Sequence, residues 1–166
     1  MNNPKQPHNF RKAGRLLCLL ALMFGGAGQV YAENNTDPAG LWLTANERSV
    51  IEVKPCESDS AKRCGNIYWI IKDGMRKDEK NPDESLRSRS LCGLEILSAF
   101  EADEQSNRWI DGKIYKADDG DIYNATMEPL PNGNLLVRGY VGLPLFGKSQ
   151  IWTPVSAGAY AKCTDK

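Results

Sequence analysis

Residues 108–141 read RWIDGKIYK-ADDGD-IYNATME-PLPNGN-LLVRGYV, three apolar, β-branched and aromatic runs separated by two turn signals. The turn signals are Asp119-Gly120 and Asn132-Gly133, dipeptides that favour the positive backbone angles of tight hairpin turns. Each run has the length and composition of a strand, so we place strands at 108–116, 122–128 and 135–141. Because tight turns join strands that pair with each other, this stretch predicts a continuous antiparallel sheet.

The same pattern continues in both directions along the chain. Further strands are expected at 40–44, 49–54, 64–72, 94–101 and 148–153, and no convincing helical stretch follows residue 33. Glycines at 112, 139 and 142 stand where a strongly coiled sheet needs them, and Gly112 lies in mid-strand, where it predicts a bend or a bulge. We therefore predict an all-β fold, an eight-stranded antiparallel up-and-down barrel, rather than a sandwich.

The first 32 residues are typical of a cleaved secretory signal peptide. Residues 1–15 carry four basic side chains and no acid, residues 16–24 are apolar, and a small-residue segment ends at Val30-Tyr31-Ala32. The apolar run is too short to span a membrane. Cleavage after Ala32 leaves residues 33–166, a length that suits one domain with its own core.

Charge and histidine content exclude several classes of function. The chain has 21 basic and 21 acidic residues, and removing the four basic residues of the signal leaves 17 against 21, a net charge of −4. A mildly acidic domain without a basic stripe argues against nucleic acid and against an anionic membrane as partners. The one histidine, His8, lies in the signal, so the mature chain has none for Ser-His-Asp or Cys-His catalysis or for binding a metal. We predict no enzyme, no metal and no cofactor.

The cysteines agree with export to an oxidising compartment. Cys18 leaves with the signal, and the four that remain are Cys56, Cys64, Cys92 and Cys163. Four cysteines allow three pairings, of which we favour Cys56–Cys64 across a short polar loop and Cys92–Cys163, which ties the C-terminal segment to the middle of the chain. Zinc is the alternative, but the spacing contains no C-x-x-C pair.

A dense run of both charges, residues 78–89, interrupts the strand pattern. Asp78, Asp83 and Glu84 lie close in sequence to Arg87 and Arg89, around an Asn81-Pro82-Asp83 turn. One interpretation is a solvated loop whose charges pair with each other. The other is the mouth of a ligand site in which Arg87 or Arg89 binds an anion.

A series of short motifs covers nearly all of the mature chain from about residue 38 to residue 152. They are Gly40-x-Trp42, Cys64-Gly65-x-Ile67-x-Trp69, Asp78-x-x-Asn81-Pro82-Asp83, Leu86-Arg87-x-Arg89, Leu91-x-Gly93-Leu94, Trp109-x-x-Gly112-x-Ile114-Tyr115, Asp119-Gly120 with Tyr123, Val137-Arg138-Gly139-Tyr140-Val141-Gly142 and Leu145-Phe146-Gly147. In this order they resemble the bacterial exported domain-of-unknown-function 2147 family. The resemblance implies a lipocalin-like (calycin-like) barrel that proteobacteria export, here to the periplasm, with no settled activity.

Gly40-x-Trp42 is also similar to the lipocalin signature, in which the tryptophan closes the barrel floor and an arginine from the last strand packs on its ring. The resemblance gives Gly40, Trp42 and Trp152 structural roles. The chain departs from the signature because Thr153 and Pro154, and no arginine, follow Trp152. Arg138, one strand earlier, is the nearest candidate. We expect Arg138 either to pack on the tryptophan floor or to meet a ligand carboxylate.

Strand alternation supplies the remaining ligand candidates. It places Trp69 with Ile67 and Ile71 on one inner face, and Tyr123 with Met127 on another. The candidate ligand-binding residues are Arg138, Tyr140, Trp69, Tyr123, Arg87 and Arg89. By analogy of fold, we expect a periplasmic barrel that binds a small apolar or amphipathic ligand. The alternative is an interaction module or inhibitor that meets an envelope protein through the loops at 78–89 and 142–147.

Overall fold

The alternating runs form eight strands in the computed structural model, which describes residues 36–164. The signal-peptide prediction for residues 1–32 therefore lies outside the described residues. The strands are β1 (Gly40–Leu43), β2 (Ser49–Pro55), β3 (Arg63–Ile70), β4 (Glu95–Ala102), β5 (Trp109–Lys116), β6 (Asp121–Pro129), β7 (Leu135–Tyr140) and β8 (Lys148–Pro154). Two 3-10 turns, η1 (Glu84–Leu86) and η2 (Pro144–Phe146), lie in the longer connections.

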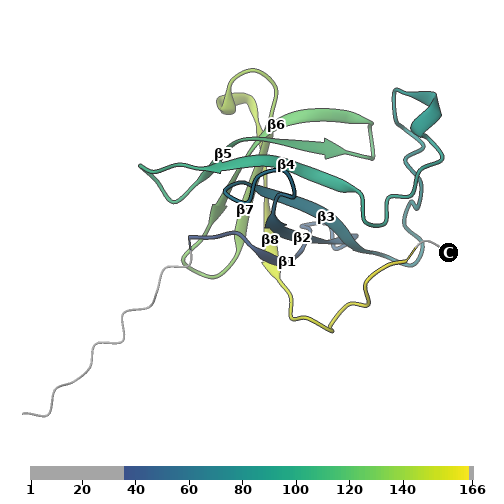
Figure 1. Ribbon diagram of the computed structural model, residues 1–166, viewed down its shortest axis with the longest axis horizontal. Coiled ribbons are helices and arrows are strands. Elements are labelled where there is room, and N and C mark those ends of the chain that lie inside the picture. Colours follow the sequence, from purple (N-terminus) through teal and green to yellow (C-terminus); the bar gives the residue numbers. More distant parts are fainter. Residues whose placement is uncertain (1–35, 165–166) are drawn as a thin grey trace, which may run out of the picture. The chain divides into compact units, whose positions relative to one another are not determined.

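Each strand pairs antiparallel with the next, and β8 closes the sheet onto β1 through Trp42 opposite Pro154 and Leu43 opposite Thr153 (Figure 1). The closed up-and-down barrel confirms the predicted fold. The two turn dipeptides behave as expected, because Gly120 and Gly133 both have positive φ angles, +78° and +82°. Among the described residues, no helix is long and apolar enough to cross a membrane.

One end of the barrel is closed by tryptophan side chains and the segment that precedes β1. The indole nitrogen of Trp42 donates to the carbonyl of Pro38 at 2.8 Å, and that of Trp109 donates to the carbonyl of Thr36 at 2.8 Å. Arg63 lies 4.6 Å above the Trp109 ring and forms an ion pair with Asp37. We call this the closed end. The expectation that Arg138 packs on the tryptophan floor is wrong, because the arginine there is Arg63, from the start of β3.

A departure from strict alternation between β2 and β3 decides which side chains of β3 enter the core. The pairing of β2 with β3 shifts by one residue between Val50 and Ile51, so that Trp69 and Ile67 no longer share a face. Ile67 and Ile70 are buried in the core, whereas Trp69 is half-buried and meets the Tyr160 ring edge-on at 4.7 Å. The prediction that Trp69 points inward with Ile67 is therefore wrong.

A bulge lies directly before Gly112, at Ile110 and Asp111, where Asp111 has a φ of +57°. The register of β5 against β6 shifts between Trp109 and Gly112, and a Cβ at Gly112 would lie 2.4 Å from the Phe100 ring. Phe100 is fully buried and fills the barrel at this level.

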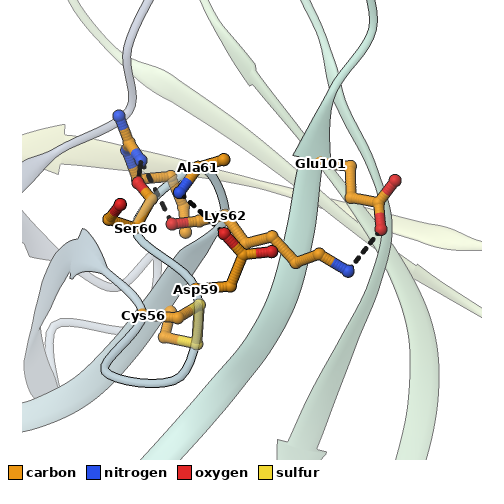
Figure 2. Close-up of a disulfide and its surroundings, with 8 residues drawn as sticks. Cys56, Asp59, Ser60, Ala61, Lys62 and Glu101 are labelled. Atoms are coloured by element: carbon orange, nitrogen blue, oxygen red, sulfur yellow. Dashed lines mark hydrogen bonds and ion pairs between the residues drawn. A yellow bond between two sulfur atoms is a disulfide. The ribbon is translucent and has the colours of Figure 1, made fainter.

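Both predicted disulfides form. Cys56–Cys64 closes the loop between β2 and β3, where Figure 2 shows Lys62 reaching across to Glu101 on β4. Cys92–Cys163 ties the C-terminal segment, yellow in Figure 1, to the connection that precedes β4. The Cys163 amide also donates to the Tyr68 carbonyl at 2.8 Å. The segment after β8 is thus fastened along the outside of β3.

Candidate functional site

A cavity of about 370 Å³ opens at the end of the barrel opposite the tryptophans, and we call it the mouth cavity. It lies where β5 ends, β6 begins, β7 ends and β8 begins. Its lining residues are Ile114, Lys116, Asp119, Tyr123, Val137, Gly139, Tyr140, Val141, Phe146, Lys148 and Gln150. The volume falls near the lower end of the range for small-molecule sites, about 300–1,000 Å³.

The room in the mouth cavity depends on a missing side chain. Gly139 pairs with Ala125, which is fully buried inside the barrel, so position 139 faces the interior as well. A Cβ placed on Gly139 would meet Ile114 Cγ2 at 3.5 Å and Tyr123 Cβ at 3.8 Å, both ordinary contacts. A larger side chain at this position would therefore occupy the cavity without disturbing the backbone.

The polar groups of the mouth cavity leave one cation in excess. Lys116 forms an ion pair with Asp119, and Tyr123 donates its hydroxyl hydrogen to the same carboxylate at 3.2 Å. The hydrogen bond to Asp119 raises the pKa of Lys116, while burial, followed by the charge of Asp119, raises the pKa of Tyr123. Within residues 36–164, no carboxylate pairs with the Lys148 ammonium. Two cations against one carboxylate give the cavity a net positive charge.

A smaller recess of about 150 Å³ adjoins the mouth cavity and shares Ile114, Lys116 and Gln150 with it. We call it the inner recess. Its wall mixes apolar side chains with polar ones such as Thr44, Arg48 and Asp118, and Met75 and Leu91 contribute to it from the long connection between β3 and β4. Leu91 is buried in the barrel core, with Met75 packed against that core. The connection therefore covers part of the open end and leaves the rest to the mouth cavity.

That connection is organised around Asp78, whose side chain is fully buried. Its carboxylate accepts hydrogen bonds from the Tyr115 hydroxyl at 2.5 Å, Asn81 Nδ2 at 2.7 Å and Arg89 Nε at 2.8 Å. Although burial alone would raise the pKa of Asp78, these hydrogen bonds, Tyr115 first, bring it below its ordinary value. Arg87 donates to the Asn81 carbonyl at 2.9 Å and forms an ion pair with Glu84. The 78–89 loop thus has the self-paired arrangement, with Arg87 and Arg89 engaged inside it.

The six predicted ligand residues fall into three places. Tyr123 and Tyr140 line the mouth cavity. Arg87 and Arg89 are bonded within the 78–89 loop, and Trp69 packs against Tyr160 of the C-terminal segment. Arg138 lies on the face of β7 that bears Ser149 opposite it, and there it binds the carbonyls of Pro144 and Leu145.

The sequence prediction did not include Lys116, Lys148, Gln150, Gly139 or Phe146 as site residues. The alternation of side chains along each strand carried a usable signal. Val137 and Gly139 are two residues apart on β7, Lys148 and Gln150 are two residues apart on β8, and the two strands pair with each other. Reading polar side chains at inward positions near strand ends would have found the two lysines.

Two other hollows, of about 400 and 360 Å³, lie beneath the 78–89 loop and beside the Cys56–Cys64 disulfide. Their walls include the charged residues Arg89, Glu95 and Lys113 in the first and Glu57, Asp59 and Lys62 in the second. Within the described part of the chain, no group of three or more His, Cys, Asp or Glu side chains is placed to hold a metal ion. The mouth cavity is therefore the candidate site, because it joins apolar walls to unbalanced positive charge at a barrel opening.

Comparisons with known proteins agree with this architecture. Residues 40–154 match the family described as "Uncharacterized protein conserved in bacteria (DUF2147)". A search of curated proteins gave no match. Among solved structures, the chain is similar to protein HP1028 from the human pathogen Helicobacter pylori, which is described as belonging to the lipocalin family. The two are 24% identical, with a TM-score of 0.63, over 73% of this chain and 84% of that one.

Proposed function

Because the chain belongs to the DUF2147 family and folds as a lipocalin-like barrel, we propose that it is an exported binding protein for one small amphipathic anion, such as a fatty acid. The ligand's apolar part occupies the mouth cavity and the inner recess, and its anionic head lies beside Lys148. The observation that carries this proposal is the combination of apolar walls and an unpaired lysine ammonium at the open end of a barrel whose other end is closed.

Two sequence features support export to the periplasm. The first 32 residues have the order of a signal peptide, and two disulfides tie the chain together, as is usual for proteins of oxidising compartments. Cell fractionation with an antibody against the mature chain tests this part. Recovery of a shortened chain in the periplasmic fraction is expected, and a full-length cytoplasmic chain would contradict it.

The binding proposal is tested first by native mass spectrometry of the mature protein purified gently from cells. We expect a reproducible adduct that is lost on denaturation. Titration with dodecanoate, kept below its micelle concentration, then compares the wild type with Gly139→Leu, which fills the cavity. Thr126→Leu is the matched control, because Thr126 pairs with Arg138 one rung away and on the other face of the same hairpin. Binding by Gly139→Leu equal to that of wild type would overturn the proposed site.

A second titration tests the anionic head. Replacing Lys148 by Met keeps most of the side chain's length but removes the charge. A partly exposed ion pair contributes about 1 kcal/mol at most, so dodecanoate affinity should fall about fivefold, while the affinity for the uncharged alcohol dodecanol should stay the same. Equal losses for both probes would show that Lys148 contributes packing rather than charge recognition.

The alternative function, an interaction module, depends on two loops that the structure shows to be different. The charged side chains of the 78–89 loop bond largely to one another, with Asp78 at the centre, which favours a structural role for that loop. The 142–147 loop differs, since Leu143, Leu145 and Phe146 are exposed. That exposure favours a contact with something outside the barrel.

A further inference from the structure

Residues 139–147 read GYVGLPLFG and contain no charged side chain. Four of them are large, apolar and mostly exposed: Val141 at 71%, Leu143 at 66%, Leu145 at 79% and Phe146 at 75%. We call these four residues the apolar tip. Single exposed apolar residues are ordinary on protein surfaces, but a contiguous group marks a surface that meets an apolar partner or a membrane.

The backbone of the apolar tip is fastened to β7 by hydrogen bonds, which leaves its side chains exposed. Arg138 donates to the carbonyls of Pro144 at 2.8 Å and Leu145 at 3.2 Å, and to Ser149 Oγ at 2.8 Å. A Cβ on Gly147 would lie 2.7 Å from the Gly139 carbonyl oxygen, so the returning chain packs directly on β7. The side chains at the tip are therefore exposed on a fastened loop.

The same hydrogen bonds satisfy backbone groups that would otherwise need water. The carbonyl of Leu143 accepts from the Phe146 amide at 3.1 Å, and that of Pro144 accepts from the Gly147 amide at 3.1 Å as well as from Arg138. Leu145 has its carbonyl bound by Arg138, and Pro144 has no amide hydrogen to lose. A loop can enter hydrocarbon only where its backbone polar groups are satisfied internally, and the carbonyls of residues 143–145 meet that requirement.

The apolar tip is continuous with the mouth cavity. Phe146 and Val141 belong to both, and Lys148 follows directly at the start of β8. A lysine just beyond an inserted apolar segment can place its ammonium at the level of lipid headgroups. Residues 139–147 contain no carboxylate that would have to be desolvated.

We infer that the apolar tip docks the protein on a lipid bilayer, with the mouth cavity opening against the lipid so that an amphipathic ligand passes between bilayer and barrel without crossing water. This inference rests on the proposed function, because it names the source and destination of the ligand. The bonded carbonyls of residues 143–145, the absence of carboxylates from residues 139–147 and the continuity with the mouth cavity favour lipid over a protein partner for this surface.

The test is flotation of the mature, disulfide-bonded protein with vesicles of phosphatidylcholine, and with the same vesicles containing phosphatidylglycerol. The tip variant is Leu143→Ser with Leu145→Ser, since neither residue lines the mouth cavity. The control is Ile151→Ser, another exposed apolar residue, which lies in mid-strand on β8 opposite Leu136. We expect wild type and control to float with both kinds of vesicle, and the bound fraction of the tip variant to fall about tenfold.

Dodecanoate titration of the same three proteins separates the two proposals. Retained dodecanoate affinity in a tip variant that no longer floats supports bilayer docking and shows that the variant is folded. Flotation of wild type and tip variant to the same extent overturns the docking inference and leaves the binding proposal standing. Loss of dodecanoate binding in all three proteins, with flotation intact in the wild type, overturns the binding proposal instead. A wild type that does not float, but self-associates or cross-links to a protein through position 145, overturns docking in favour of a protein interface.

Discussion

At the scale of single residues, Asp78 is the side chain on which the long connection between β3 and β4 depends. Replacing Asp78 by Ala leaves the partly buried Arg89 guanidinium without its carboxylate and Tyr115 and Asn81 without their acceptor. Breaking such a pair from one side costs about 3 kcal/mol of unfolding free energy. Urea denaturation of Asp78→Ala should show that loss, and the exposed neighbour Glu79→Ala should stay within about 0.5 kcal/mol of wild type.

The contribution of Asp78 depends on pH in a known direction. Its pKa in the folded protein is lowered, so the unfolded chain takes up a proton first as the pH falls. The stabilisation is fully present above the ordinary carboxyl pKa of about 4 and is lost as the pH falls through the lower folded value. The stability difference between wild type and Asp78→Asn should therefore be constant near neutrality and shrink below about pH 4. A difference that grew on acidification would contradict this assignment.

Gly120 and Gly133 form a natural pair of experiments, because both occupy hairpin turns with positive φ. A Cβ on Gly120 would lie 2.0 Å from the Lys80 carbonyl oxygen, whereas a Cβ on Gly133 would meet nothing within 4 Å. Gly133→Ala should cost only the strain of the left-handed backbone, about 1 kcal/mol. Gly120→Ala must also displace the 78–89 loop and should cost about 2 kcal/mol more. An equal fall in melting temperature for both variants would show that the 78–89 loop moves aside at no cost in stability.

The hairpin turns and the short Cys56–Cys64 disulfide could be predicted from sequence because each rests on local geometry. Asp119-Gly120 and Asn132-Gly133 favour hairpins whatever surrounds them, whereas Gly112 is required by the Phe100 ring packed against it. Trp69 could not be placed, because a one-residue slip of β2 against β3 moves it to the other face. Ala99 shows the same limit: it adopts a φ of +60° within β4, so that Leu97 and Phe100 are both buried although they stand at positions of opposite parity.

At the scale of elements, Arg138 donates three hydrogen bonds, two that fasten the 142–147 loop to β7 and one to Ser149 on β8. Arg138→Ala removes all three, whereas Ser149→Ala removes one. A loop that opens locally is cleaved in proportion to its open population. Chymotrypsin should therefore cut Arg138→Ala after Leu145 or Phe146 about tenfold faster than wild type, since the lost bonds together contribute somewhat more than 1 kcal/mol. Ser149→Ala should be cut at nearly the wild-type rate.

The two disulfides constrain very different lengths of chain. Cys56–Cys64 spans 8 residues and Cys92–Cys163 spans 71. Loop-closure entropy in the unfolded chain then gives about 2.5 kcal/mol for the first and about 4.5 kcal/mol for the second. Urea unfolding of Cys92→Ser with Cys163→Ser should show the larger loss, together with a change in tryptophan fluorescence as Tyr160 leaves Trp69. A larger loss for the Cys56 and Cys64 pair would contradict the entropic account.

The candidate site could be predicted less completely than the strands that build it. All eight strands lie within two residues of their predicted bounds, since hydrophobic periodicity and turn residues mark them locally. Lys116 and Lys148 come together only because β5 ends and β8 begins at the same opening of a closed barrel, and that juxtaposition depends on the register of every strand pair between them. The sequence predicts that Arg138 points into the barrel, whereas in the structure it lies opposite Ser149 and bonds to it.

At the scale of the whole molecule, the barrel is asymmetric. Tryptophans, Arg63 and the segment before β1 close one end, while the other keeps its space through Gly139 and its charge through Lys148. An eight-stranded barrel is wide enough either to fill itself with side chains or to hold one small ligand. This barrel is filled with side chains near Phe100 and Trp109 and keeps a cavity at the mouth. A ligand bound there contacts four strands at once, so its binding must be coupled to the stability of the whole fold.

That coupling predicts a thermal signature. A ligand that binds only the folded protein adds RT ln(1 + [L]/Kd) to the unfolding free energy, about 2.7 kcal/mol at a hundred times Kd. For a domain of this size, the melting temperature should rise by about 10 °C at that dodecanoate concentration, and should go on rising with each further tenfold increase. Gly139→Leu should melt at the same temperature at every concentration, because its cavity is filled, and Thr126→Leu should follow wild type. A wild-type melting temperature that does not change with dodecanoate, while both variants remain folded, would mean that the mouth cavity does not bind an amphipathic anion.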